Sequence, residues 1–264
     1  MPRAKRRLGQ HFLSDRGILE RIADALEITA GDTVLEIGPG PGALTEVLAA
    51  RAGKLVAIEK DHELIPGLRE RIPAVAVIEA DALEADWHAI AGTDFLVAGN
   101  IPYNITSPLL DKALTPPRPR RIVFLVQKEV ADRVGAPPGA EAYGALSVGV
   151  QSVARAERLF TVPAGAFHPR PKVDSAVLRL TPLVEPVVRD AEVDSFRRLV
   201  VGLFGFRRKQ MRRGLRELTG WDAERVEHAL GRASIDPRVR PETVAPAQFA
   251  ELLRTLVDGG WTAT

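Results

Sequence analysis

The chain has 264 residues, of which 45% are hydrophobic and 27% charged, with a net charge of +2, as in an ordinary soluble globular protein. It contains no cysteine, which excludes disulfides and thiolate sites, and its five histidines lack the close spacing of zinc ligands. No apolar run approaches the roughly 20 residues of a membrane span, and no apolar stretch follows the basic N-terminus as in a signal peptide. We therefore expect a cytoplasmic protein with no bound metal and no membrane partner.

Short apolar segments alternate with helical patterns through the first two thirds of the chain. The expected strands are residues 33–37, 55–58, 75–78, 95–98 and 122–126, and the expected helices between them are residues 43–51, 64–71 and 108–114. A further helix with Ile18, Ile22 and Leu26 on one face precedes them, capped by Ser14 or Asp15. Strands about 20 residues apart with helices between them predict a parallel, doubly wound, Rossmann-like α/β sheet. Residues 161–163 and 173–180 are expected to add an antiparallel edge.

The last third of the chain is predicted to be helical. Residues 181–193 are rich in proline and charge and are interpreted as a linker. Beyond it, helical patterns cover residues 195–204, 209–218, 223–230 and 247–256. We predict a catalytic domain over residues 1–184 and a small, all-helical C-terminal domain over residues 185–264.

A glycine-rich segment, Glu36-Ile37-Gly38-Pro39-Gly40-Pro41-Gly42, joins the first expected strand to a helix. Glycines at such a junction let the backbone turn tightly and approach a ligand. Glu59 ends the second strand, where a carboxylate can accept hydrogen bonds from ribose hydroxyls. Asp81 follows the third strand and can accept from the amino group of a bound adenine. A tight turn and two helix caps would also explain these residues singly, but together they predict a nucleoside-containing cofactor.

The prolines of this loop favour S-adenosylmethionine (SAM) over NAD. Pro39 and Pro41 each remove a backbone N–H that the pyrophosphate of NAD would use. SAM carries a sulfonium cation and no pyrophosphate. An NAD-dependent dehydrogenase stays open as an alternative at this point.

The segment Gly99-Asn100-Ile101-Pro102-Tyr103-Asn104 follows the fourth expected strand. The amino nitrogen of adenine is a poor nucleophile, because its lone pair is delocalised into the ring. The Asn100 side-chain oxygen and a backbone carbonyl at Ile101 or Pro102 can accept its N–H groups and stabilise the charge that develops on methyl transfer. Pro102 fixes the backbone, and Tyr103 offers a face for stacking an extruded base. A turn with a packed tyrosine is the structural alternative.

A second candidate contact is Phe167-His168-Pro169-Arg170-Pro171-Lys172. Phe167 can stack on the target base, and Lys172 can meet a phosphate. An aromatic residue in a proline-rich loop is equally well explained by a place in the core. The predicted catalytic residues are Asn100, Pro102, Tyr103 and Phe167.

Basic residues concentrate between residues 197 and 216, a stretch without any Asp or Glu. On a helical wheel those from Arg208 to Arg216 share one face, which is either a solvated surface or a site for a nucleic-acid backbone. The absence of interleaved acids favours the second interpretation. The predicted RNA-binding residues are Arg207, Arg208, Lys209, Arg212, Arg213 and Lys172. Arg3, Lys5, Arg6 and Arg7 form a second basic cluster.

Taken together, these motifs resemble those of the bacterial small-subunit rRNA adenine dimethyltransferases, the KsgA/RsmA family. The segments that carry the resemblance are residues 8–13, 36–42, 57–59, 81–82, 99–104, 127–130, 142–144, 167–177, 207–209, 235–237 and 240–242. They extend over nearly the whole chain. In one loop, residues 137–143, Glu141 stands where the family more often has a basic residue, which casts doubt on that loop as an RNA contact.

The resemblance implies a class I SAM-dependent methyltransferase that acts as a monomer. Its implied cofactor contacts are His11, Leu13, Gly38, Glu59, Asp81 and Asn100. His11 and Leu13 come from the resemblance alone and imply an N-terminal segment folded over the cofactor. The implied substrate is 16S rRNA in an assembling small ribosomal subunit, dimethylated at N6 of two adjacent adenosines in a hairpin loop near its 3′ end.

Three other functions remain to be weighed. A methyltransferase of large-subunit rRNA shares the fold and the Asn-x-Pro-Tyr type of motif, although residues 167–177 and 235–242 favour the small subunit. An assembly or transcription factor that has lost catalysis is a second possibility, which Glu59, Asp81 and Asn100 argue against. In the third, a dehydrogenase, the Asn100 motif has no evident role.

Overall fold

The computed structural model describes residue 5 and residues 8–262, and it divides the chain into two compact units. The first unit comprises Met1–Ala131 and Ala156–Pro182, and the second comprises Asp132–Arg155 and Leu183–Thr264. The division differs from the predicted boundary at residues 184 and 185 because residues 132–155 belong to the helical unit. The catalytic and RNA-binding roles of the two domains remain predictions.

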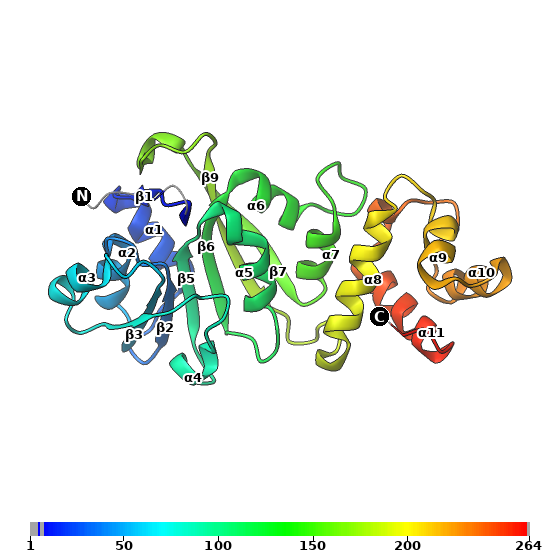
Figure 1. Ribbon diagram of the computed structural model, residues 1–264, viewed down its shortest axis with the longest axis horizontal. Coiled ribbons are helices and arrows are strands. Elements are labelled where there is room, and N and C mark those ends of the chain that lie inside the picture. Colours follow the sequence, from blue (N-terminus) through cyan, green and yellow to red (C-terminus); the bar gives the residue numbers. More distant parts are fainter. Residues whose placement is uncertain (1–4, 6–7, 263–264) are drawn as a thin grey trace. The chain divides into compact units, whose positions relative to one another are not determined.

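The first unit is built on a seven-stranded sheet in the order β4-β3-β2-β5-β6-β9-β7 (Figure 1). The strands are β2 (Thr33–Ile37), β3 (Lys54–Glu59), β4 (Ala76–Glu79), β5 (Leu96–Asn100), β6 (Arg121–Gln127), β7 (Ala154–Val162) and β9 (Ser175–Pro182). The first five strands in this order, β4, β3, β2, β5 and β6, pair in parallel with their neighbours. Strand β9 pairs antiparallel to β6. The order of the strands reverses between β2 and β5, and ligands of such sheets bind at the carboxyl ends of the strands on either side of the reversal. The predicted Rossmann-like fold is confirmed.

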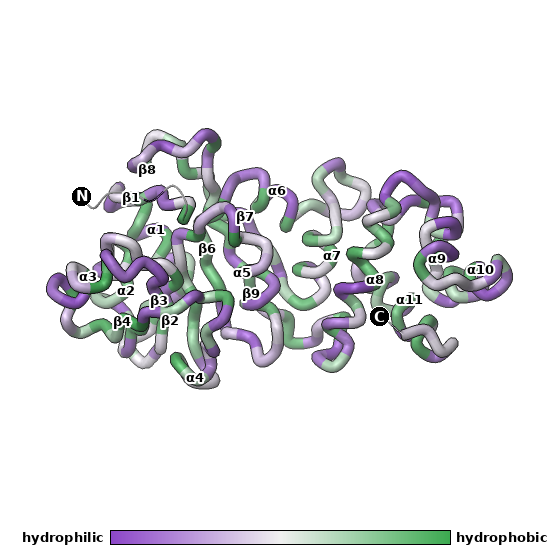
Figure 2. The backbone as a smooth tube through the Cα atoms, in the orientation of Figure 1, coloured by the Kyte–Doolittle hydropathy of each residue, from purple (hydrophilic) through white to green (hydrophobic). Residues whose placement is uncertain are grey.

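Apolar strand residues and amphipathic helices form the core of this unit. The helices are α1 (Arg16–Leu26), α2 (Ala43–Ala49), α3 (Ile65–Arg71), α4 (Trp87–Ala91) and α5 (Thr106–Ala113), and α6 (Lys128–Gly135) begins in this unit and ends in the second. Helix α1 begins after Asp15, whose carboxylate accepts a hydrogen bond from the Ile18 N–H at 3.0 Å. Its buried Ile22 and Leu26 face the sheet, where α1 contacts β5 and β6. Figure 2 shows how strongly hydrophobic β6 is along its length.

A two-stranded ribbon adds a feature that the sequence did not predict. Strand β1 (Phe12–Leu13) pairs antiparallel with β8 (Phe167–His168), so that Leu13 lies opposite Phe167. The pairing joins two segments that are far apart in the chain. It places the N-terminal segment beside the proline-rich loop.

The second unit is helical, as predicted. Its helices are α7 (Ala145–Gln151), α8 (Val193–Gly205), α9 (Met211–Thr219), α10 (Ala223–Arg232) and α11 (Pro246–Asp258). Tyr143, Phe204 and Phe249 pack in an aromatic cluster at its centre, and the Tyr143 hydroxyl donates to the Val244 carbonyl at 2.9 Å. Tyr143 is fully buried, so the aromatic residue of the segment 142–144 belongs to the core of this unit.

Helix α9 begins two residues later than predicted. The N–H groups of Met211 and Arg212 donate to the carbonyls of Val239 and Pro237, at 2.7 and 3.1 Å, so the segment 235–242 completes the start of the helix. The prediction that Arg208 and Lys209 lie on one face of this helix is therefore wrong, because both residues lie in the turn before it. No helix in the described residues is long and apolar enough to cross a membrane.

Candidate active site

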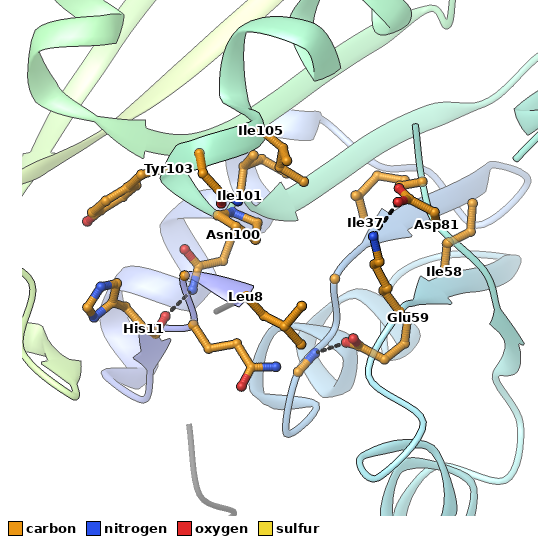
Figure 3. Close-up of a pocket in the computed structure, with 18 of the residues that line it drawn as sticks. Leu8, His11, Ile37, Ile58, Glu59, Asp81, Asn100, Ile101, Tyr103 and Ile105 are labelled. Carbon is orange, nitrogen blue, oxygen red and sulfur yellow. Dashed lines mark hydrogen bonds and ion pairs between the residues drawn. The ribbon is translucent and has the colours of Figure 1, made fainter. Parts of the chain in front are cut away.

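A cavity lies at the carboxyl ends of the parallel strands β2 to β5 (Figure 3). Its walls come from the glycine-rich loop after β2, the ends of β3 and β4, the Asn100 segment after β5, and residues 8–12 of the N-terminal segment. Of the predicted site residues, it is lined by His11, Gly38, Glu59, Asp81, Asn100, Pro102 and Tyr103. The sheet thus brings together side chains that are distant in the sequence.

The glycine-rich loop is held by hydrogen bonds that its three glycine N–H groups donate to the loop and to the end of β3. Gly38, Gly40 and Gly42 all have positive φ angles, of 66°, 57° and 95°, which glycine adopts without strain. A Cβ on Gly40 would stand 3.2 Å from the Phe12 ring. The three glycine N–H groups donate within the protein, to the Ile58 carbonyl, the Glu59 carboxylate and a loop carbonyl. Because no glycine N–H is left for a phosphate, the loop does not suit a pyrophosphate.

Glu59 is buried at the end of β3 and braces the loop. Its Oε2 accepts from the Gly40 N–H at 3.0 Å and its Oε1 from the Asp61 N–H at 2.7 Å. Burial raises the pKa of Glu59 above its ordinary value, although these backbone donors act against the rise. Each oxygen keeps a second lone pair, so the carboxylate can also accept from a pair of ribose hydroxyls.

Asp81 follows β4 on another wall of the cavity. Its Oδ2 lies 2.5 Å from the Lys60 ammonium, and its Oδ1 accepts from the Leu83 N–H at 2.9 Å. Lys60, above all, holds the pKa of Asp81 below its ordinary value. The ionised carboxylate is an acceptor fit for the amino group of a cofactor adenine. Acidic Glu59 and Asp81, with a loop free of phosphate-binding donors, fit the nucleoside of SAM.

The Asn100 side chain is oriented by the N-terminal segment. Its Nδ2 donates to the His11 carbonyl at 2.8 Å, which turns Oδ1 toward the side of Tyr103 (Figure 3). The preceding residue has to be glycine because β2 and β5 lie close together there: a Cβ on Gly99 would lie 2.6 Å from the Ile37 carbonyl oxygen. The Pro102 carbonyl already accepts from Ile105 and Thr106. Of the two carbonyls considered for the substrate amino group, the Ile101 carbonyl is therefore the better candidate.

Tyr103 is fixed at both its hydroxyl and its ring. The hydroxyl lies 2.8 Å from the Ser175 Oγ on β9. The His11 ring stacks on one face at a centroid separation of 5.5 Å and an angle of 27°, so a base stacking on Tyr103 needs the other face or a movement of His11. Burial raises the pKa of Tyr103, which keeps the phenol neutral at physiological pH.

Residues 1–257 match the family model described as ribosomal RNA adenine dimethylase. The chain belongs to the ribosomal RNA adenine dimethylase family. Membership confirms the predicted enzyme class, rRNA adenine dimethylation with SAM as methyl donor, and excludes the dehydrogenase. No group of three or more His, Cys, Asp or Glu in the described residues could hold a metal ion.

Individual relatives agree with this assignment. The "Ribosomal RNA small subunit methyltransferase A" of Geobacter metallireducens is 43% identical over 264 residues, 97% of this chain and 96% of that protein. The protein of the same name from Moorella thermoacetica is 44% identical over 270 residues, 97% of this chain and 93% of its own. Among solved structures, a dimethyladenosine transferase from Plasmodium falciparum superposes with a TM-score of 0.82 at 26% identity, covering 96% of this chain and 100% of that one. The 23S rRNA methyltransferase ErmE gives 0.73 at 32% identity, covering 93% and 99%.

Of the predicted catalytic and cofactor-binding residues of this dimethylase, two lie outside the main cavity. Leu13 and Phe167, each 5% exposed, face each other in the β1–β8 ribbon and pack in the hydrophobic core. Leu13 borders a smaller cavity beside the glycine-rich loop. Phe167 is not among the residues that line either cavity. The structure therefore places it in the core, which was the alternative to a contact with the target base. Lys172 is exposed beyond the ribbon.

The N-terminal segment is clamped across the site by contacts that the sequence did not reveal. Lys5 Nζ lies 2.6 Å from Asp61 Oδ1, and Gln10 Nε2 donates to Asp61 Oδ2 at 3.0 Å. Burial opposes ionisation of Asp61, but the hydrogen bonds from Lys5 and Gln10 outweigh it and lower the pKa. Lys5 of the predicted second basic cluster is thus paired, whereas Arg3, Arg6 and Arg7 lie outside the described residues.

The basic segment of the helical unit is partly engaged in internal contacts. The Arg207 guanidinium donates to the Glu141 carbonyl at 2.9 Å, and Lys209 forms an ion pair with Glu217, just beyond the acid-free stretch. Arg212 is half-buried and donates to the Gln210 side chain at 3.1 Å. Arg208 and Arg213 are exposed. These last two are the best placed of the predicted residues for a phosphate backbone.

Tyr103 offers a direct test of base stacking. Tyr103→Ala is expected to lower kcat/KM about 10- to 100-fold, since stacking on an aromatic ring contributes about 1–3 kcal/mol per base. Tyr103→Phe keeps the ring and should lose less than about fivefold, as should Ser175→Ala, which removes the partner of the hydroxyl. Steady-state methylation of rRNA by the three variants measures these effects. Equal losses in the Ala and Phe variants would assign the role to the hydroxyl instead of the ring.

Proposed function

We propose that this dimethylase transfers methyl groups from SAM to N6 of two adjacent adenosines in a hairpin loop near the 3′ end of 16S rRNA. Each adenosine receives two methyl groups, on an assembling small ribosomal subunit in the cytoplasm. The observation that carries the proposal is the pairing of Asn100 with Tyr103 at the cavity, which offers an acceptor and a stacking face to one base. The assignment to the small subunit is supported by relatives above 40% identity that carry its name, against 32% for the 23S enzyme.

The cofactor is proposed to lie along the strand ends with its nucleoside on the acidic side of the cavity. SAM supplies an electrophilic methyl group on its sulfonium. Glu59 accepts from the ribose hydroxyls, and Asp81 accepts from the adenine amino group. Gly38 and Asn100 flank the opposite end, where methyl transfer takes place. His11 closes the cavity from the N-terminal segment, and Leu13 supports it from the ribbon.

The target adenine is proposed to stack on Tyr103 and to present its amino group to Asn100. Asn100 Oδ1 and the Ile101 carbonyl accept the two N–H groups and stabilise the positive charge that develops on the nitrogen. Pro102 holds both acceptors in place. The amino proton becomes acidic only on methyl transfer, so no side chain needs to remove it beforehand. Phe167 stays in the proposed catalytic set, and its contact with a base requires β8 to move away from β1.

The rRNA is proposed to contact basic side chains of both units, and the enzyme to act as a monomer. The proposed contacts are Arg207, Arg208, Lys209, Arg212 and Arg213 in the helical unit and Lys172 in the catalytic unit. Arg208 and Arg213 are expected to contribute most, because they are exposed and the others of the segment are engaged or half-buried. Lys and Arg bind phosphates without reading sequence, so these contacts supply affinity more than specificity.

A methylation assay with labelled SAM tests the substrate. Small subunits that lack the adenine methyl groups should be labelled, whereas large subunits should not. Labelling of free 16S rRNA in a parallel reaction shows whether methylation requires the assembled particle. Label on 23S rRNA, the substrate in the name of the ErmE neighbour, would overturn the small-subunit assignment. Binding of SAM without label on any RNA would instead support an assembly factor.

Replacing Arg208 and Arg213 together by Ala should weaken RNA binding and flatten its salt dependence. Each phosphate contact contributes roughly 0.7–0.9 to the slope of log K against log salt concentration, so the slope should fall by about 1.5. Lys54→Ala is the control, because Lys54 is exposed at the opposite, amino-terminal end of β3. Filter binding at several salt concentrations measures the slopes. An unchanged slope in the double variant would place the RNA elsewhere.

A further inference from the structure

Asp61, two residues after Glu59, is a buried carboxylate to which the proposed chemistry gives no task. It is 2% exposed. Its Oδ1 lies 2.6 Å from Lys5 Nζ, and its Oδ2 accepts from Gln10 Nε2 at 3.0 Å. Gln10 Oε1 in turn accepts from the Lys5 backbone N–H at 2.8 Å, so the three residues form a closed ring of contacts. Because a buried charge is unfavourable without a partner, these contacts are what allows the carboxylate to be covered.

Residues 8–12 cross the main cavity between Asp61 and the segment after β5. All five of them line the cavity. At one side Gln10 is bound to Asp61, and next to it the His11 carbonyl accepts from Asn100 Nδ2 at 2.8 Å (Figure 3). Asp61 and Asn100 stand at the ends of β3 and β5, which lie on either side of β2 in the sheet. Residues 8–12 therefore bridge the end of β2, where the cofactor is proposed to lie.

The two sides of the contact at Asp61 are held differently. Asp61 is anchored to the wall by its backbone, since its N–H donates to Glu59 Oε1 at 2.7 Å and its carbonyl accepts from the Leu64 N–H at 3.0 Å. Gln10 reaches Asp61 through its side chain. If the contact breaks, residues 8–12 are therefore the part that moves, while the wall stays in place.

The cavity has to exchange its contents once in every reaction. Each methyl transfer turns SAM into S-adenosylhomocysteine, which has to leave before the next SAM enters. The contacts of Asp61 with Lys5 and Gln10 join protein groups to each other, so they have the same strength with and without a cofactor. Breaking them therefore limits entry and exit alike.

With SAM in the main cavity as proposed above, we propose that Asp61 is a positioning residue for the cofactor. Together with Lys5 and Gln10 it forms a latch, which holds residues 8–12 over the cavity and sets how fast SAM enters and S-adenosylhomocysteine leaves. Asp61 and Lys5 are not among the described residues that line the cavity, so they act through Gln10 and its neighbour His11.

Surface plasmon resonance on the immobilised full-length protein, with S-adenosylhomocysteine as the probe and without RNA, measures both rate constants. Asp61→Asn keeps an oxygen for Gln10 and removes the charge that pairs with Lys5. The association and dissociation rate constants should each rise about tenfold, because hydrogen bonds between charged groups are stronger than neutral ones. Their ratio, the Kd, should change less than about threefold, whereas loss of a direct cofactor contact would mainly speed dissociation and raise the Kd.

The other partner of the ion pair supplies matched variants. Lys5→Met should have the same effect as Asp61→Asn, and the double variant should exchange the probe no faster than the faster single variant, because both changes break one contact. Lys5→Arg keeps the charge and should stay within about twofold of the unmodified rates. Asp94→Asn is the control, an exposed acid that pairs with Arg120 at the amino-terminal end of β5, away from the cavity.

Faster dissociation with unchanged association would overturn the latch, since Asp61 would then support a cofactor contact. Unchanged rates in both Asp61→Asn and Lys5→Met would overturn it too. Lys5→Met decides even if Asp61→Asn does not fold. Failure of the unmodified protein to bind the probe would overturn the placement of the cofactor and the latch with it. The expected rates in a protein that labels no small subunit would support the latch and overturn the proposed substrate alone.

Discussion

Replacing Asn100 with Ala is expected to lower the rate of methyl transfer by at least about a hundredfold. The change removes Oδ1, the side-chain acceptor proposed for the adenine amino group, where positive charge develops during transfer. Removal of one such preorganised group costs roughly 10²–10³ in rate in other enzymes. RNA affinity should change less than about threefold, because the proposed phosphate contacts lie elsewhere. Single-turnover methylation at saturating SAM and RNA measures the chemical step directly.

The same substitution also removes the hydrogen bond from Nδ2 to the His11 carbonyl, so its effects need to be separated. Ser107→Ala, at an exposed position of the following helix α5, is the control, and it should keep the rate within about threefold. SAM affinity, measured beside the rate, reports whether the N-terminal segment still closes the cavity. Transfer by Asn100→Ala within tenfold of the unmodified rate would show that the acceptors lie elsewhere.

The sheet and most of the site could be predicted because both depend on short-range patterns. The apolar run 122–126 lies within the observed β6, since strand residues buried on both faces of a sheet form continuous apolar segments. Residues that follow neighbouring parallel strands meet at one edge, which is why Gly38, Glu59, Asp81 and Asn100 surround a single cavity. Distance along the chain does not matter once the strand order is set.

Features that depend on distant segments were missed. The β1–β8 ribbon has two-residue strands, too short for a periodic pattern, and this pairing buries Leu13 and Phe167 instead of exposing them in the cavity. Arg208 and Lys209 have good helix propensity, but helix α9 begins only at Met211. There the carbonyls of Val239 and Pro237 accept the first N–H groups of the helix. Residues 132–155 join the helical unit, although a strand–helix pattern precedes them without interruption.

Glu36 illustrates a limit of a different kind. A glutamate at the end of an apolar strand is easily attributed to the loop that follows. Only the structure reveals that its carboxyl is buried with an unpaired oxygen, whereas Glu59 makes two backbone hydrogen bonds. Two acids near the carboxyl ends of adjacent strands therefore differ in their hydrogen bonds, although the sequence presents them alike.

Glu59→Ala is expected to weaken SAM binding by about a hundredfold or more. Each hydrogen bond from a ribose hydroxyl to this charged acceptor contributes about 1.5–3 kcal/mol, so losing two costs about 3–6 kcal/mol. The substitution also leaves the N–H groups of Gly40 and Asp61 without their acceptor, so the glycine-rich loop should loosen and the Tm should fall. Glu79→Ala, the exposed register neighbour of Glu59 on β4, is the control for removing a carboxylate from the end of the sheet.

A second variant separates ligand binding from support of the loop. Glu59→Gln keeps one oxygen acceptor, but its amide N–H₂ group faces a backbone donor, so it should fall between Glu59→Ala and the unmodified protein in both SAM affinity and Tm. Calorimetry with SAM and thermal unfolding without it measure the two quantities. If Glu59→Ala lost Tm but bound SAM normally at a temperature where it is folded, the carboxylate would only brace the loop. The ribose hydroxyls would then need another acceptor on the same wall of the cavity.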